Sequence, residues 1–567
     1  MWFNLKSGPS SALTYLLSNP LDFNAIEYVN ITFKGMETNP EIKRLFELAE
    51  HFEKIKKSLF TLLPKALYQL EVESKAFGKS CIGNSKKAYK KSVASNESIY
   101  GFIDRAEKLN IQLDRIIEHF EISKRGHEEP YSIELLKLIK FYWLSENIYL
   151  VFIGISSVMF ENGICHFYPK SQRAKSNLLG TWVANHFESM SNMSNLAYFD
   201  FVPNGVLNSI RVKSILNLIA TNFLDKFFSI STGTPSEKFS QLPIYNMIHN
   251  YCLIITVLYW SRLKLNKSDV STDDLENFGI DIDKLEQLDK LMKSMNALDR
   301  VFSLEHGKVT LLTESISYQS RFIVKSAFNE LSDRDIGVFN NLSGKEFELS
   351  IWGKKDNYKD KYDFIEGLTY QEKLHGDEKL DVDLIIRDKR RGKYFFIQIK
   401  YILAGGLAYL SGDHWYSTKT KKSIKKAVRQ LNSAKELHKK FLLNEHLESL
   451  GVTDCTFSNT EYLIVHNICN LDFQVDESNI AMYEWNTFRN LLDDGRCDVG
   501  NTRDISNKEW RYHSALPLEV PQSVIDTLIH CSPAFVVPGA DKIKDTFDII
   551  TTVSFESFKF ESKGLGL

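Results

Sequence analysis

The chain has 567 residues, 43% of them hydrophobic, and a formal net charge of −2. This length predicts roughly two to four domains with substantial cores, and the near-zero charge excludes a general attraction for nucleic acid, which would have to arise locally. The two most apolar segments, residues 148–160 and 251–260, are shorter than the ~20 residues of a membrane-spanning helix. We therefore expect them to be buried helices, and we expect no membrane partner.

The N-terminal residues and the cysteines predict a cellular compartment. Residues 1–17 contain no sustained apolar run after a basic start, so no signal peptide is predicted. The seven cysteines form no CxxC pair, which is typical of free thiols in a reducing compartment. We expect a cytoplasmic protein.

Residues 1–320 are predicted to form an α-helical region, which could comprise two subdomains. Cys165 and His166 are two potential metal ligands, too few for a zinc site. Nothing in the region resembles a catalytic constellation, so we expect a sensor, partner or target-recognition module that binds another protein or a second copy of the chain. Apolar spacing predicts helices at residues 39–135, 133–160, 207–228, 242–265 and 282–304, and a polar connection at 268–283.

Residues 321–475 are predicted to form an α/β domain, and residues 476–567 a C-terminal extension packed on it. Runs of β-branched and aromatic residues predict strands, and longer amphipathic stretches predict helices. The predicted order is helix 321–331, helix 342–349, strands 362–370, 381–386 and 394–401, helix 419–444 and strand 462–466, followed in the extension by helix 487–492 and strands within 549–560.

Side chains capable of chemistry are concentrated in the second and third of these strands. Asp383 lies at the start of one strand, and Gln398 and Lys400 lie two residues apart on the next, so that the latter two point to the same face. Burying polar and charged groups is costly unless they are paired or bind a metal. This combination in two apolar strands therefore indicates a site.

An aspartate directly before one apolar strand, with Gln398-Ile399-Lys400 on the next, resembles the pattern of the PD-(D/E)xK nuclease superfamily. The glutamine form is similar to the Mrr-like branch with a QxK motif. The resemblance covers residues 331–467. It implies a restriction-endonuclease-like α/β fold, with a mixed central sheet flanked by helices, and phosphodiester hydrolysis that depends on Mg²⁺ or Mn²⁺.

The resemblance also implies a role for each site residue. Asp383 would be the main metal ligand, the Gln398 amide oxygen a neutral second ligand and the Ile399 carbonyl a third. Lys400 would orient or deprotonate the attacking water, or stabilise the charged transition state. Similar nucleases often carry an acid on the first helix, and Glu348 matches that position and would reach the metal or its water.

Several assignments have alternatives in the residues themselves. Asp381 shares a face with Asp383, and Glu346 could stand in the place of Glu348. Similar nucleases often carry a glutamine on the helix after the lysine strand; Gln430 matches, although it could equally be an amide on the helix surface. The whole polar face could also be the solvated face of an ordinary sheet.

Two basic clusters are predicted to flank the site and bind phosphate independently of sequence, although a run of charges is usually a solvated face. Trp415 could stack on a splayed base. The clusters comprise Lys421, Lys422, Lys425, Lys426 and Arg429 on the polar side of helix 419–444, and Arg387, Lys389, Arg390, Arg391 and Lys393 in the loop between the two strands.

Together these features predict a cytosolic, Mg²⁺-dependent endonuclease that acts on DNA rather than RNA. Such architectures occur in prokaryotic restriction and antiviral defence, which is an analogy of fold alone. The rival prediction is a non-catalytic module that retains the nuclease fold and binds nucleic acid or protein. The neutral side chain of Gln398 leaves this rival open.

Overall fold

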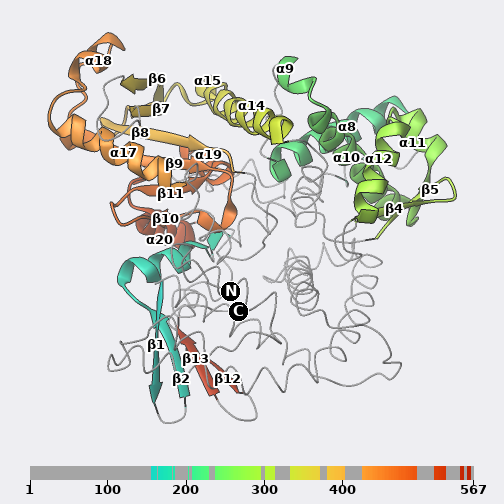
Figure 1. The fold of residues 1–567 in the computed structure, drawn as a ribbon, viewed down its shortest axis with the longest axis horizontal. Helices are drawn as coiled ribbons and strands as arrows, with labels where there is room; N and C mark the ends of the chain where they lie inside the picture. The colour runs from blue at the N-terminus through green and yellow to red at the C-terminus, as the bar shows by residue number, and fades with distance from the viewer. Residues whose placement is uncertain are drawn as a thin grey trace. The chain divides into compact units, whose positions relative to one another are not determined.

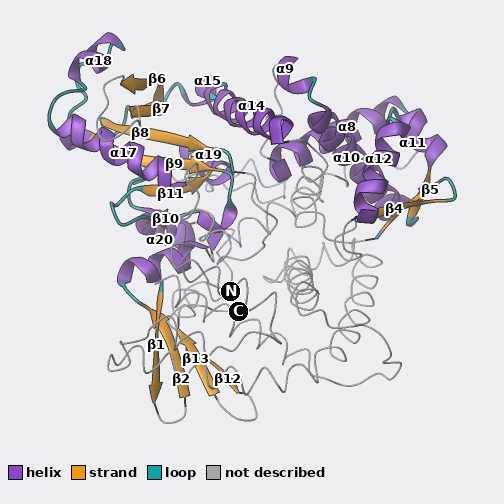
Figure 2. Cartoon of the chain, in the orientation of Figure 1, coloured by secondary structure: helices purple, strands orange, loops and turns teal. Residues whose placement is uncertain are grey.

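The computed structural model describes residues 155–161, 164–181, 183–184, 199, 202–203, 207, 209–228, 237–294, 301–312, 333–370, 380–402, 424–493, 516–531, 550–554 and 559–563 (Figures 1 and 2). The chain divides into two compact units, Met1–Leu179 with Pro538–Leu567, and Gly180–Val537. The domain boundaries near residues 320 and 475 stay a prediction. No helix among the described residues has both the length and the apolarity needed to cross a bilayer.

The first unit contains a four-stranded mixed sheet. Its order is β1 (Ser156–Glu161), β2 (Ile164–Pro169), β13 (Lys559–Lys563) and β12 (Ile550–Ser554). β13 runs parallel to β2, and the other neighbours are antiparallel. The prediction of a helix up to residue 160 is therefore wrong at its end, because periodicity alone cannot distinguish a short apolar run in a strand from one in a helix. The strands predicted near the end of the chain are confirmed.

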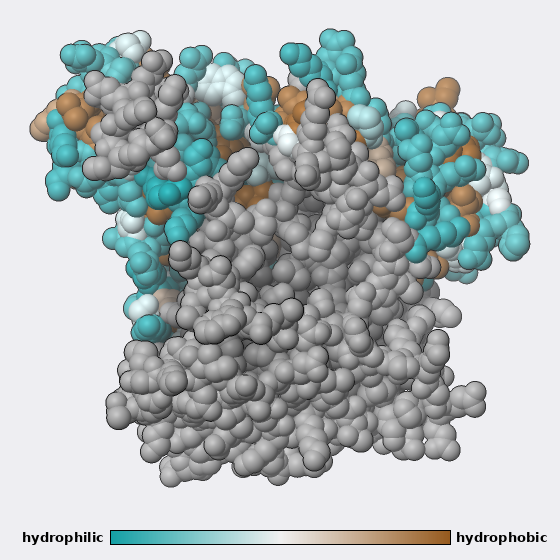
Figure 3. All heavy atoms as spheres, in the orientation of Figure 1, coloured by the Kyte–Doolittle hydropathy of each residue, from teal (hydrophilic) through white to brown (hydrophobic). Residues whose placement is uncertain are grey.

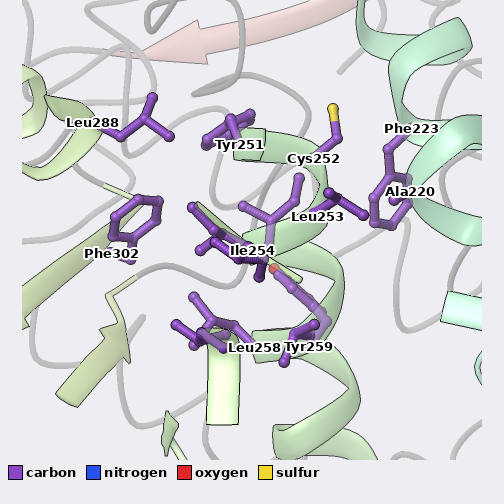
Figure 4. Close-up of a cluster of buried hydrophobic side chains, with 14 of the residues drawn as sticks. Ala220, Phe223, Tyr251, Cys252, Leu253, Ile254, Leu258, Tyr259, Leu288 and Phe302 are labelled. Atoms are coloured by element: carbon purple, nitrogen blue, oxygen red, sulfur yellow. The ribbon is translucent and has the colours of Figure 1, made fainter. Parts of the chain in front are cut away.

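The second unit begins with a helical region whose core is drawn in Figure 4. α10 (Pro243–Trp260) is buried on nearly all sides, and Tyr251, Cys252 and Ile254 are fully enclosed. α10 packs against α8 (Ile210–Phe228) and α12 (Ile282–Ser294). The shorter helices of this region are α9 (Glu237–Ser240), η3 (Ser261–Leu265) and α11 (Thr272–Phe278).

A small antiparallel sheet, which the sequence did not predict, lies in this helical region. It comprises β3 (Asp269–Ser271), β5 (Lys308–Leu311) and β4 (Phe302–Glu305) in that order. β4 and β5 are joined by His306 and Gly307, with φ of 51° and 70°, the sign that a tight hairpin turn requires. The helix predicted over 282–304 therefore ends at residue 294, and the connection predicted at 268–283 contains β3 and α11.

A six-stranded mixed sheet forms the centre of the remaining part of this unit (Figure 1). β8, β9 and β11 run parallel, and the other neighbours are antiparallel. The predicted strands in this part are confirmed to within a few residues. The order is β10 (Gln474–Val475), β11 (Ala481–Glu484), β9 (Thr460–His466), β8 (Lys393–Lys400), β7 (Leu380–Asp388) and β6 (Tyr362–Tyr370).

Helices accompany this sheet. α17 (Ile424–Lys439) connects β8 to the parallel β9 and packs on β7, β8 and β9 through Ala427, Leu431 and Ala434. The predicted helix 419–444 ends earlier, at Lys439, and Phe441, which adopts φ of +62°, is 72% exposed. The other helices are α14 (Asp333–Trp352), α15 (Lys355–Tyr358), α18 (Asn444–Ser449), α19 (Trp485–Leu492) and α20 (Pro521–Cys531).

The helices predicted at 342–349 and 487–492 are confirmed within α14 and α19. Three predicted helical segments lie outside the described residues: 39–135, 321–331 and the start of 419–444. On the face shown in Figure 3, the described atoms are mainly hydrophilic, with hydrophobic groups between them. Such scattered apolar exposure is ordinary for a folded domain.

Candidate functional site

The predicted site residues lie where β7 separates from β8. The backbone pairing of these strands extends to Leu384 opposite Ile397, and past this point side chains bridge them. β8 remains paired with β9 as far as Lys400 opposite His466, and β7 remains paired with β6 to its first residue. This place, the fork, comprises Asp381–Asp383 of β7 and Gln398–Lys400 of β8.

Asp383 bridges the two arms of the fork. Its Oδ2 accepts a hydrogen bond from the main-chain N of Ile399 at 2.6 Å and another from Lys400 Nζ at 3.2 Å. The Asp383 and Lys400 side chains are only 8% and 18% exposed. Burial raises the pKa of Asp383 above its ordinary value, although Lys400 and the Ile399 N–H oppose that rise. No hydrogen bond within the described residues reaches Asp383 Oδ1, which leaves this oxygen for a ligand.

Gln398 presents a buried amide oxygen in the same fork. The residue is fully buried, and its Nε2 donates to the main-chain oxygen of Asp381. Rotating the amide would place two acceptor oxygens together, so this bond identifies the oxygen and the nitrogen. Oε1 has no hydrogen-bond partner among the described residues, and a buried acceptor left in this state costs about 1–3 kcal/mol. The structure therefore presents an oxygen that suits a hard cation.

Two other fork residues have distinct parts in this arrangement. Asp381 uses its main-chain oxygen to hold Gln398, whereas Asp383 uses its carboxylate to hold β8. The geometry thus gives the two aspartates different surroundings. Ile399, predicted to offer its carbonyl, is 4% exposed and donates its N–H to Asp383.

Glu348 of α14 belongs to the electrostatic surroundings of the fork. Its pKa is raised to about 7, first by loss of hydration around the carboxyl, although the residue as a whole is exposed, and then by the charge of Asp383. Lys400 opposes this rise. Next to Glu348, the Phe347 ring lies 5.7 Å from that of Tyr401, which directly follows β8.

Glu346 lies in different surroundings, although it is only two residues away. It is 7% exposed and acts electrostatically on Tyr245 of the helical core. Of the two acids that the sequence left open, the structure therefore brings Glu348 to the fork.

α17 carries the remaining predicted residues. Gln430 is 5% exposed, and its Oε1 has no hydrogen-bond partner in the ranges that the structure describes, so it is not an amide on the helix surface. Lys425 and Arg429 are exposed, and Lys426 is half-buried. Because α17 connects parallel strands, it runs against them and begins at the edge where β8 ends. Its first turns therefore lie at the end of the sheet that carries the fork. Lys421, Lys422 and Trp415 lie outside the described residues.

The basic loop between β7 and β8 does not flank the fork, which corrects the prediction. β8 begins at Lys393 and ends at Lys400, so the loop lies roughly 20 Å away at about 3.3 Å per residue. Its cations are also matched by acids. Arg387 contacts Asp454 at 2.5 Å and Lys389 contacts Asp363 at 2.7 Å. The further pairs are Arg390 with Asp388, Arg391 with Glu519, and Lys393 with Glu461 and Glu519.

Two residues that sequence reasoning missed adjoin the fork. His466, opposite Lys400, is fully buried, and burial lowers its pKa to about 3, so it is neutral. The amide of Asn467 bonds to both main-chain groups of Ile402, at 2.8 and 3.0 Å. Because parallel strands end at the same edge of a sheet, the residues that follow strand 462–466 could have been placed beside Lys400 from the predicted order.

The donor set at the fork is small. Within the described ranges, no three His, Cys, Asp or Glu side chains are grouped closely enough to hold a metal ion. A cation there would rely on Asp383 and on neutral oxygens. Comparison of the chain with protein-family models, with curated proteins and with solved structures finds no match.

Proposed function

We propose that the chain is a Mg²⁺- or Mn²⁺-dependent nuclease, with a restriction-endonuclease-like domain of the PD-(D/E)xK type and an Mrr-like QxK motif, that hydrolyses phosphodiester bonds of DNA in the cytoplasm. The observation that carries the proposal is the fork. There the buried Gln398 oxygen lacks a hydrogen-bond partner within the described part of the chain, and it lies on the same pair of strands as the Asp383 carboxylate and the Lys400 ammonium. A role in prokaryotic restriction or antiviral defence is part of the proposal by analogy of fold.

A divalent cation would supply a Lewis acid and a more acidic water at this place. Asp383 Oδ1 and Gln398 Oε1 would hold it, since both oxygens lack a hydrogen-bond partner among the described residues. The residues fit such an ion only loosely, because Gln398 is neutral. One fewer negative charge than in an acid-bearing site predicts weak metal binding.

Lys400 and Glu348 would stabilise the developing negative charge and transfer protons in the reaction. Lys400 Nζ, which lies 3.2 Å from Asp383 Oδ2, would orient or deprotonate the water, or stabilise the negative charge that develops on the phosphate. Glu348, with a pKa of about 7, is suited to accept and return a proton near neutral pH. Lys425, Lys426 and Arg429 would contact the phosphate backbone.

A second function is favoured by a specific observation. Lys400 is ion-paired with Asp383, and no group of three acidic, histidine or cysteine ligands occurs in the described parts of the chain. Both features suit a module that retains the fold and binds nucleic acid or protein without cleaving it.

The deciding experiment measures cleavage of double-stranded DNA, single-stranded DNA and RNA in Mg²⁺, in Mn²⁺ and in EDTA. The variants are Lys400→Ala and, as a matched control, Lys389→Ala, which removes an exposed lysine from the far end of the same hairpin. Metal-dependent cleavage that is lost in Lys400→Ala and kept in Lys389→Ala supports the nuclease. Binding without cleavage under every condition supports the module instead.

A further inference from the structure

β6, which pairs with β7 on the side away from β8, contains a glycine directly opposite Asp383. β6 pairs with β7 through Glu366 opposite Leu384, and again through Leu368 opposite Val382. The register is the same on both sides, so Gly367 faces Asp383 and no residue is inserted. The regular pairing is interrupted only at this position of the ladder. The single interruption therefore coincides with the residue that carries the carboxylate of the fork.

Gly367 allows an approach that no other residue permits. A Cβ on Gly367 would lie 1.9 Å from the Val382 main-chain oxygen and 2.6 Å from that of Asp383, where Cβ atoms are essentially never found closer than 3.0 Å. Both of these neighbours are backbone atoms and cannot rotate away as a side chain would. A glycine inside a strand often marks such a close approach of another backbone.

The approach occurs where β7 leaves β8. On the β8 side, the regular pairing with β7 stops at Ile397, and the hydrogen bonds from Gln398 and Ile399 to β7 each involve a side chain. The Gln398 amide and the Asp383 carboxylate therefore need room between the strands. A β7 backbone that lies close to β6 provides this room, and only a glycine at position 367 lets β7 lie there.

We infer that Gly367 is a positioning residue that holds β7 toward β6 and thereby sets the separation between Asp383 and Gln398 for metal binding. This inference rests on the proposed function. An alanine at this position must displace the backbone of residues 382 and 383. Displacement toward β8 would narrow the fork and move the Asp383 carboxylate relative to the Gln398 oxygen.

The experiment measures Mn²⁺ binding to the full chain by isothermal titration calorimetry, for wild type, Gly367→Ala and Gly337→Ala. Gly337 is an exposed glycine of α14 with open space around its Cβ position, so its variant adds the same methyl group without a clash. We expect Gly367→Ala to bind Mn²⁺ roughly 10–100-fold more weakly, the usual loss when the support of a ligand is removed, and Gly337→Ala to bind as wild type does. Titrations are made well below the unfolding temperature of each variant, so a loss of stability alone does not change the affinity.

The outcomes separate this inference from the proposed function. If wild type binds no Mn²⁺, the proposed metal site fails and the inference fails with it. If wild type binds Mn²⁺ and folded Gly367→Ala binds it equally well, only the inference is overturned.

If Gly367→Ala does not fold, deuterium uptake of wild type decides. Mn²⁺ should slow uptake in peptides from both β6 and β8, because the ion would fix β7 against both neighbours. Protection confined to β8 would overturn the inference.

Discussion

The two ends of β8 carry similar polar residues, but they differ in how fully these residues are paired and in the direction of their pKa shifts. At the Lys393 end, Arg391 and Lys393 both form ion pairs with Glu519. Burial would raise the pKa of Glu519, but hydrogen bonds from Arg391 and Lys393 outweigh it and hold the pKa below its ordinary value. At the Lys400 end, the pKa values of Asp383 and Glu348 are raised instead, and no described residue bonds to the amide oxygen of Gln398.

Charge in a sequence therefore does not by itself indicate a binding site. The basic loop is the denser cluster, yet its cations are paired with acids, most of which come from elsewhere in the fold. The fork has fewer charges but incomplete pairing, and perturbed pKa values are common at functional sites. If this difference distinguishes a structural cluster from a functional site, changes at the two ends of β8 should have different effects.

The largest expected effect is at the fork. Asp383→Ala removes the carboxylate that bridges β7 and β8 and should abolish metal-dependent cleavage. Circular dichroism should show the wild-type secondary structure, since the hydrophobic contacts of the sheet remain. Full cleavage by a folded Asp383→Ala protein would remove the fork from consideration as the active site.

Breaking the pairing at the other end should affect stability alone. Arg391→Ala leaves a largely buried Glu519 with one cation fewer, and should lower the free energy of unfolding by about 1.5–3 kcal/mol, the usual range for hydrogen bonds to charged groups. The half-saturating Mg²⁺ concentration should not move. The check is urea unfolding beside a Mg²⁺ titration of cleavage, and a double variant with Glu519→Ala should cost less than the sum of the single changes.

Changing Gln398 should shift the metal requirement in both directions. Gln398→Glu adds a negative charge beside the cation and should lower the Mg²⁺ concentration for half-maximal cleavage, whereas Gln398→Ala should raise it, each by roughly tenfold or more. If Lys400 acts as a base, the new charge should also move the pH profile upward, because it stabilises the ammonium. Identical Mg²⁺ curves for all three proteins would show that Gln398 is not a ligand.

The contributions of Glu348 and Glu519, at the two ends of β8, to the free energy of unfolding should change in opposite directions with pH. Glu348 has a pKa of about 7 in the folded protein against an ordinary value of 4.5, so the folded state binds more protons between these values. Its contribution to stability is complete below about pH 4.5 and is lost as the pH rises through about 7. The pKa of Glu519 is lowered on folding, so its contribution is present above pH 4.5 and is lost as the pH falls below that value.

Urea unfolding in EDTA across this pH range checks both signs. Glu348→Gln should remove the decline toward neutral pH, and Glu519→Gln should remove the decline toward acid pH. A Glu348→Gln protein with the wild-type pH dependence would contradict the raised pKa.

The smallest effect is expected on α17. Lys425→Ala with Lys426→Ala removes two cations at the start of the helix, and Lys439→Ala with Lys440→Ala removes two at its other end. The first pair should reduce the dependence of DNA binding on salt by roughly 0.7–0.9 in slope for each lost phosphate contact. The second pair should leave the slope unchanged. Equal slopes for the two double variants would mean that the start of α17 is merely solvated.

Local sequence patterns were enough for the elements that carry the fork. Strands 362–370, 381–386, 394–401 and 462–466 were predictable because β-branched and aromatic residues in short runs favour extended backbone whatever surrounds them. The shared face of Gln398 and Lys400 follows from the alternation of a strand. The helical stripe of α17 was predictable for the same kind of reason, since its spacing depends only on helix geometry.

Only the tertiary structure decided which charges are satisfied. Of the acids that neutralise the basic loop, Asp363, Asp454 and Glu519 are each separated from it in sequence. Likewise β13, which pairs with β2, comes from the far end of the chain. Local patterns specify backbone conformation, whereas pairing, burial and pKa depend on contacts between distant residues. The polar residues of the hairpin could thus be identified from the sequence. Only the tertiary structure showed that the cations near Lys393 are ion-paired with acids, whereas the fork at Lys400 contains polar atoms without a described partner.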